Sequence, residues 1–118
     1  MALHNELGKN GEYLAADFLQ QKGYAIVCKN WRHKQYEIDI IATKGRKLHF
    51  VEVKTRSSDF YGHPEDSVTK KKFRFLQNAA DEYLFLHPGY KWIQYDIVSI
   101  TFQNNGTPEY FLLEDVFM

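Results

Sequence analysis

The chain is poor in cysteine and has no long apolar run among its 118 residues. Its single cysteine, Cys28, excludes an internal disulfide and a metal site built from several thiolates. A lone thiol is typical of a reducing compartment, so we expect a cytoplasmic protein in which Cys28 is a small strand residue. No stretch approaches the roughly 20 apolar residues that cross a bilayer, and the first residues lack the pattern of a secretory signal. We therefore expect no membrane association.

The sequence also lacks an excess of charge, since 15 basic residues balance 15 acidic ones. The balance disfavours a protein that binds nucleic acid non-specifically through a net positive charge. The charges are nevertheless segregated: residues 28–56 hold eight basic and three acidic residues, and residues 75–118 hold one basic and six acidic. Local basic patches, and not the total charge, are the feature that bears on binding partners.

The length fits one domain, residues 1–118, and the 44% of hydrophobic residues are enough for a globular core. Apolar spacing predicts a helix over about 5–22 and another from 67 or 68 to 86. Runs rich in aromatic and β-branched residues predict strands over 24–31, 37–43, 47–55, 91–102 and 110–116. The order α-β-β-β-α-β-β predicts an α/β fold, a mixed sheet flanked by two helices with the last strand at an edge.

The central hairpin carries the most informative pattern. Gly45-Arg46 fits the two central positions of a type II′ turn, which requires glycine first. That register places Asp39 directly across from Glu52 on one face of the sheet, with Lys54 at the next position on the same face. A slip of one residue would send the two acids to opposite faces. We therefore expect two carboxylates about 5 Å apart beside an ammonium.

Two carboxylates at that separation repel each other, and a fold that keeps them together usually supplies a cation. Oxygen ligands favour hard ions, so the expected cofactor is Mg²⁺ or Mn²⁺. Such an ion can polarise a phosphate oxygen and lower the pKa of a bound water. Lys54 would then hold or deprotonate that water, or neutralise the phosphate. The alternative is an ordinary amphipathic strand, which fits less well because Leu48 and Phe50 lie on the charged face.

A set of motifs is spread over residues 8–100. They are Gly8-x-x-Gly11-Glu12, Gly23-Tyr24, Asn30-x-Arg32, Glu37-Ile38-Asp39-Ile40-Ile41-Ala42, Phe50-Val51-Glu52-Val53-Lys54-Thr55-Arg56, Lys72 and Tyr95-Asp96-Ile97-Val98. With these motifs the sequence resembles the bacterial YraN-type family, and through it the PD-(D/E)XK, or restriction-endonuclease-like, superfamily near the archaeal Holliday-junction resolvases. The resemblance implies that Asp39 and Glu52 bind the metal, that Lys54 assists the water, and that Glu12 is a further catalytic carboxylate from the first helix.

One position departs from that family. Tyr36 precedes Glu-Ile-Asp where the family usually has glycine, and its ring could narrow the entrance to the site or stack on a base. Basic residues near the site are candidates for phosphate contacts, with a solvated charged face as the alternative reading. They are Arg56, which follows the site, and Lys70, Lys72 and Arg74, which open the second helix.

Three functions follow from these patterns. The first is a metal-dependent endonuclease or structure-selective nuclease acting on DNA, working as a homodimer if it follows the resolvases. The second is a non-catalytic nucleic-acid-binding module that keeps the nuclease fold and acts with a partner protein. The third is a small protein-interaction domain with a salt-bridged hairpin. Among other polar residues we expect His49 to be packed, Asp96 to make structural hydrogen bonds, and His63 to be a candidate proton carrier.

Overall fold

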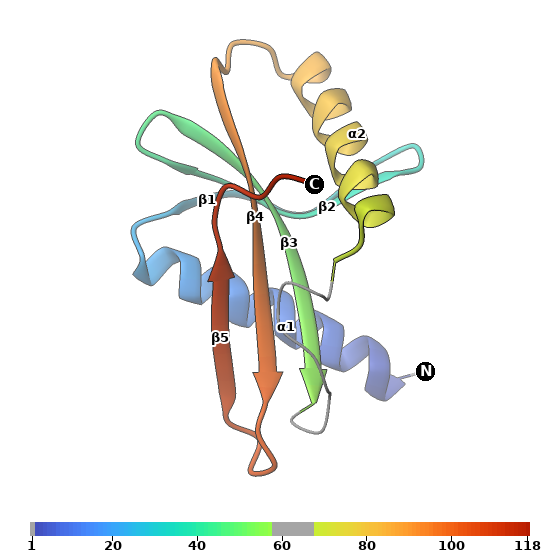
Figure 1. Cartoon of the computed structure of the whole chain (residues 1–118), viewed down its shortest axis with the longest axis vertical. Helices are drawn as coiled ribbons and strands as arrows, with labels where there is room; N and C mark the ends of the chain where they lie inside the picture. The colour runs from blue at the N-terminus through green and yellow to red at the C-terminus, as the bar shows by residue number, and fades with distance from the viewer. Residues whose placement is uncertain (1, 58–67) are drawn as a thin grey trace.

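A computed structural model describes the backbone of residues 2–57 and 68–118 and the side chains of 11–57 and 68–118 (Figure 1). His63 lies outside the described residues. The order of elements is the predicted one, and the fold class is therefore confirmed. The elements are α1 (Ala2–Gln21), β1 (Ala25–His33), β2 (Tyr36–Lys44), β3 (Lys47–Ser57), α2 (Lys70–Leu86), β4 (Trp92–Phe102) and β5 (Pro108–Leu113).

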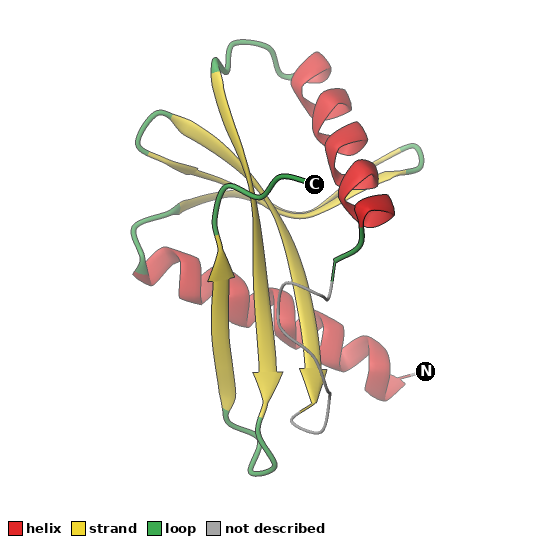
Figure 2. Ribbon diagram, in the orientation of Figure 1, coloured by secondary structure: helices red, strands yellow, loops and turns green. Residues whose placement is uncertain are grey.

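The strands form one mixed sheet in the order β1-β2-β3-β4-β5. Neighbouring strands are antiparallel except β3 and β4, which run parallel. A parallel pair needs a crossover connection, and α2 lies within this one. The last strand, β5, is an edge strand as predicted. Figure 2 shows the two helices on opposite faces of the sheet, α2 in front and α1 behind.

Side chains alternate between the two faces along the middle of β3. Leu48 and Phe50 are fully buried in the cluster beneath α2, which includes Phe73 and Leu76 of that helix. Val51 is fully buried in the cluster beneath α1, together with Leu19. The predicted assignment of these strand residues to faces is confirmed, and Glu52 and Lys54 therefore continue the face covered by α2.

A buried polar network around the Asp96 carboxylate joins β3 to β4. The Asp96 carboxylate lies 2.6 Å from Nδ1 of His49 and accepts hydrogen bonds from Nε2 of Gln94 at 2.9 Å and from the backbone N–H of Asp115 at 3.0 Å. His49 and Asp96 are both buried. The predictions that His49 is packed and that Asp96 makes structural hydrogen bonds are thus confirmed. These bonds offset the free-energy cost of burying a carboxylate.

Gly11 marks a close approach of α1 to the sheet. A methyl group built on Gly11 would overlap the Cγ2 methyl of Thr55 on β3. Thr55 is β-branched and has little freedom to move its methyl away. Glycine at this position therefore lets α1 lie close to the strand that carries Glu52 and Lys54, and it places Glu12, the next residue, beside the sheet.

Replacing Gly11 by alanine should lower the free energy of unfolding by about 1–3 kcal/mol, because the new methyl overpacks the contact with Thr55. Helix propensity alone predicts the opposite, a gain of about 1 kcal/mol. Urea unfolding of Gly11→Ala and of Gly11→Ala with Thr55→Ser measures the difference. The second substitution removes the opposing methyl, so the double variant should recover most of the loss; failure to recover would show that the overlap is not the cause.

Candidate functional site

The turn between β2 and β3 sets the register of the site. Gly45 has a positive φ of 63° and Arg46 does not have a positive φ. A type II′ turn requires this combination, with the positive φ at the first central position only. The ladder runs from Lys44 opposite Lys47 to Ile40 opposite Val51. Its continuation places Asp39 opposite Glu52, which is the predicted register.

Asp39 lies where the β2–β3 ladder ends. Beyond Ile40 no further pairing joins the two strands, and Figure 1 shows β2 turning away from β3 beneath α2. The backbone N–H of Val53 instead donates a hydrogen bond to Oδ2 of Asp39 at 2.8 Å. The carboxylate thus satisfies the donor that the ladder leaves unpaired, and this bond fixes the orientation of Asp39.

The divergence of β2 coincides with a break in side-chain alternation. Ile38 and Ile41 both join the cluster beneath α2, although they are three residues apart. On the neighbouring strand β1, Asn30 has a φ of 55°, which is left-handed and uncommon for a residue other than glycine. Strict period-two alternation, which would put Ile38 and Ile41 on opposite faces of the sheet, therefore does not hold through this stretch.

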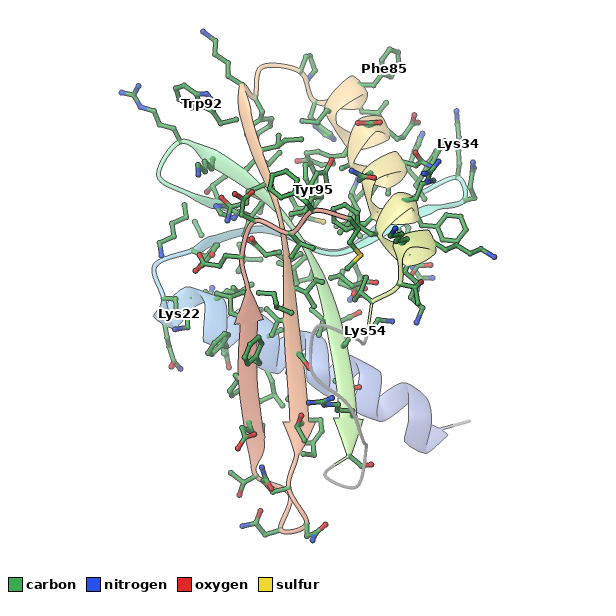
Figure 3. All side chains as sticks on the ribbon, in the orientation of Figure 1. Lys22, Lys34, Lys54, Phe85, Trp92 and Tyr95 are labelled. Atoms are coloured by element: carbon green, nitrogen blue, oxygen red, sulfur yellow. The ribbon has the colours of Figure 1, made fainter. Side chains whose placement is uncertain are left out.

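Asp39, Glu52 and Lys54 line one cavity of about 330 Å³, which we call the Asp39–Glu52 cavity. Lys72 reaches the same cavity from α2. Figure 3 labels Lys54 on β3, beneath the N-terminal end of α2. The other described residues that line this cavity are Glu37, Val53, Phe75 and Leu76.

The two carboxylates in the cavity lie in an electrostatically unfavourable environment. Burial, followed by repulsion from the Glu52 carboxylate and a hydrogen bond with it, raises the pKa of Asp39 to about 8. The hydrogen bond from Val53 and the Lys54 ammonium act in the opposite direction, but they do not outweigh the burial. A divalent cation between the two carboxylates would relieve their repulsion.

The two lysine side chains in the cavity, Lys54 and Lys72, also repel each other. A hydrogen bond with the Lys54 side chain, which the Lys72 nitrogen can accept only as a neutral amine, and repulsion from the Lys54 ammonium lower the pKa of Lys72. The backbone N–H of Lys72 donates a hydrogen bond to Oγ1 of the N-cap residue, Thr69, at 3.2 Å. Two neighbouring ammonium groups favour an anion between them, and a phosphate supplies that charge.

Glu12 lies close to the site but lines a different cavity. Burial, followed by the nearby Asp39 carboxylate, raises the pKa of Glu12, and a hydrogen bond with Asn30 opposes the shift. The cavity that Glu12 lines has about 280 Å³ and is shared with Tyr13, Lys29 and Asn30. The structure thus brings Glu12 beside Asp39 from the α1 side, without placing it among the residues that line the Asp39–Glu52 cavity.

The other predicted phosphate contacts are not gathered at this cavity. Nε of Arg56 donates a hydrogen bond to Oγ1 of Thr101 on β4 at 2.9 Å, so this side chain is held along the sheet. Lys70 and Arg74 are exposed on α2 and do not line the cavity, whereas Lys72 does. Of these predicted residues of α2, Lys72 is the one that reaches the cavity, and its contact with a phosphate stays a prediction.

Sequence reasoning missed Glu37 and Phe75 as lining residues. Phe75 follows Lys72 by three positions on α2, so helical spacing places both on one face and was the available signal. Glu37 lies two positions before Asp39 on β2. Both residues also line an adjoining cavity of about 470 Å³, together with Gln35, Tyr36 and Asn78.

The carboxylate oxygens of Asp39 and Glu52 fit a hard cation whose other ligands come from water and substrate. Within the described side chains there is no cluster of three or more His, Cys, Asp or Glu side chains placed to hold a metal together. The pair Asp39 and Glu52 still suits Mg²⁺, which usually takes one or two carboxylates and completes its shell with water and phosphate oxygens. Across residues 2–57 and 68–118, no helix is long and apolar enough to cross a membrane.

Comparison with known proteins places the chain in a family. The pattern described as "Uncharacterised protein family UPF0102" matches residues 11–100. A UPF0102 protein of Flavobacterium psychrophilum is 47% identical over 100 residues, covering 85% of this chain and 84% of its own length. One of Chlorobium phaeobacteroides is 42% identical over 115 residues, covering 95% and 91%. One of Bacteroides thetaiotaomicron is 41% identical over 106 residues, covering 90% and 88%. This chain therefore belongs to the UPF0102 family.

Proposed function

We propose that this protein is a metal-dependent nuclease that hydrolyses phosphodiester bonds in DNA. The observation that carries the proposal is the meeting of two carboxylates, Asp39 and Glu52, with two ammonium groups, Lys54 and Lys72, in one cavity. The resemblance to the PD-(D/E)XK superfamily and to resolvases agrees with this arrangement. It also agrees with the mixed sheet flanked by two helices.

Each residue has a role that its position supports. Asp39 and Glu52 would hold Mg²⁺ or Mn²⁺, and the hydrogen bond from the Val53 N–H fixes the orientation of the Asp39 carboxylate. Such an ion, when bound, would polarise a phosphate oxygen and lower the pKa of a water bound to it. Lys72 binds the phosphate, and Lys54 holds the water and stabilises the charge that develops on the phosphoryl oxygens. The water oxygen forms a bond to phosphorus as the P–O bond opposite it breaks; the proton that the water loses passes to solvent, and the departing strand oxygen takes up a proton from solvent.

A cleavage assay tests the proposal. Full-length protein is incubated with branched, single-stranded and duplex DNA in Mg²⁺, in Mn²⁺ and in EDTA, and the products are resolved on denaturing gels. We expect cleavage of at least one substrate with either metal and none in EDTA. The Glu52→Gln variant, purified identically, should lose the activity, which excludes a contaminating nuclease. No cleavage of any substrate by the folded wild type would overturn the proposal.

A non-catalytic nucleic-acid-binding module is the second candidate. The observation that favours it is the basic surface of α2 outside the cavity, where Lys70, Lys71 and Arg74 are exposed. Such a module would bind DNA in EDTA as tightly as in Mg²⁺ and would leave every substrate intact. The same assay therefore separates the two functions.

A further inference from the structure

A second cavity adjoins the Asp39–Glu52 cavity between α2 and the β1–β2 hairpin. It has about 470 Å³ and is lined by Gln35, Tyr36, Glu37, Phe75 and Asn78, and we call it the Tyr36–Phe75 cavity. Its size falls within the range of about 300–1,000 Å³ that is typical of small-molecule sites. Glu37 and Phe75 line both cavities, so the two form adjacent compartments of one site.

The two compartments differ in chemistry. The Asp39–Glu52 cavity contains two ammonium groups, which attract a phosphate. No cation is among the described residues that line the Tyr36–Phe75 cavity, and its one charged group, the Glu37 carboxylate, is paired with Arg32 at 3.7 Å, so the cavity offers a phosphate no charged partner of its own. Its two aromatic rings offer faces on which a base can stack. The amides of Gln35 and Asn78 and the Glu37 carboxylate are groups that hydrogen-bond to base edges.

Phe75 has no evident role in stabilising the fold. It is 61% exposed, although its neighbours on α2, Phe73 and Leu76, are almost fully buried in the core. Tyr36 is half-buried and packs against the cluster beneath α2, which fixes the position of its ring. Asn78 follows Phe75 by three positions and therefore lies on the same face of the helix. An exposed aromatic ring beside a fixed one, both next to a phosphate-binding cavity, is what a stacked base requires.

We propose that the Tyr36–Phe75 cavity binds an unpaired nucleobase of the strand whose phosphate occupies the Asp39–Glu52 cavity. This inference rests on the proposed nuclease function and names its substrate class. A base inside a duplex is stacked and paired, and it reaches such a pocket only after it is flipped out. The preferred substrate is therefore DNA with an unpaired nucleotide next to the cleaved bond, as in a single strand, a flap or an open junction.

Binding experiments in EDTA test the base pocket without requiring cleavage. Fluorescence anisotropy measures the affinity of the full chain for a labelled single strand, for the matching duplex and for single strands with one abasic position at each site in turn. The Phe75→Ala variant should bind the single strand about 5- to 100-fold more weakly, the range expected for loss of one stacked base. Its affinity for the duplex should be unchanged.

Two variants make the test specific. Phe85→Ala removes a ring that is 79% exposed at the far end of the same helix, where Figure 3 labels it, and should leave all affinities unchanged. Phe75→Tyr keeps the ring and should retain the affinity for the single strand. One abasic position should weaken binding by the wild type, and the same position should make no further difference in Phe75→Ala.

The outcomes separate the base pocket from the nuclease. If Phe75→Ala binds the single strand as tightly as Phe85→Ala while the wild type still cleaves, the pocket is overturned and the nuclease stands. If the predicted losses occur but no metal supports cleavage, the pocket stands and the nuclease is overturned. If the wild type binds no DNA of any form, both are overturned.

Discussion

Replacing Asp39 by asparagine is expected to lower the rate of metal-dependent DNA cleavage by about 10³-fold or more. Asparagine keeps the size of the side chain, and its carbonyl oxygen can still accept the hydrogen bond from Val53. It lacks the negative charge that holds the cation. Losing the several kcal/mol that a metal supplies to the transition state corresponds to a loss of that order, at about 1.4 kcal/mol per factor of ten.

Single-turnover cleavage of the best substrate, with and without Mn²⁺, measures this effect. The matched control is Asp81→Asn, the same exchange at an exposed position of α2, and its rate should equal that of the wild type. Binding of DNA in EDTA should persist in both variants because the lysines are untouched. A rate for Asp39→Asn within tenfold of the wild type would remove Asp39 from the proposed metal site.

The same substitution is expected to stabilise the metal-free protein, and more so as the pH rises. Burial and the neighbouring Glu52 carboxylate raise the pKa of Asp39 to about 8 in the fold, from 3.8 for a freely exposed aspartate. The folded state therefore retains a proton that the unfolded state has lost between these values, and stability falls as the pH rises through this window. Asparagine does not titrate, so the advantage of Asp39→Asn over the wild type should grow by about 2–4 kcal/mol between pH 5 and pH 8.5.

Thermal unfolding in EDTA at both pH values measures this gain, which corresponds to a difference in Tm on the order of 10 °C. Asp81→Asn should show no such growth with pH. Adding Mg²⁺ at pH 8.5 should stabilise the wild type and leave Asp39→Asn unchanged, because an ion bound only by the folded state adds to its stability. An equal difference in Tm at the two pH values would show that Asp39 does not carry the raised pKa.

These two results belong together. A carboxylate kept buried beside another carboxylate costs stability, and such a cost is typical of functional sites and unusual in a hairpin that serves only the fold. An ordinary solvated strand, the alternative reading of Val51-Glu52-Val53-Lys54, predicts that Asp39→Asn is neutral in both experiments. The pair of measurements therefore tests function and energetics with one variant.

Local rules were sufficient to predict the register of the central hairpin. Gly45 admits the positive φ of the turn, and the turn sets the ladder from Lys44 opposite Lys47 to Ile40 opposite Val51, whose continuation has Asp39 opposite Glu52. Period-two alternation then places Leu48, Phe50, Glu52 and Lys54 on the face covered by α2. Helix and strand order followed from apolar spacing, with ends that differ by a few residues, as fraying elements usually do.

Long-range geometry was beyond those rules. The separation of β2 from β3 after Ile40 depends on how the β1–β2 hairpin packs beneath α2, and period-two reasoning could not anticipate that Ile38 and Ile41 would join one cluster. For the same reason the sequence did not reveal that Arg56 bonds to Thr101, or that Phe75 and Tyr36 share a cavity. These contacts join elements whose relative placement no local pattern encodes.

The most direct test of the account is a crystal of the wild type soaked in Mn²⁺ and measured at a wavelength where manganese scatters anomalously. We expect one anomalous peak coordinated by both Asp39 and Glu52, with Lys54 and Lys72 facing its open side, and no peak at this place in a Glu52→Gln crystal soaked alongside. Ordered crystals with an empty Asp39–Glu52 cavity, or with manganese bound only elsewhere, would contradict this expectation.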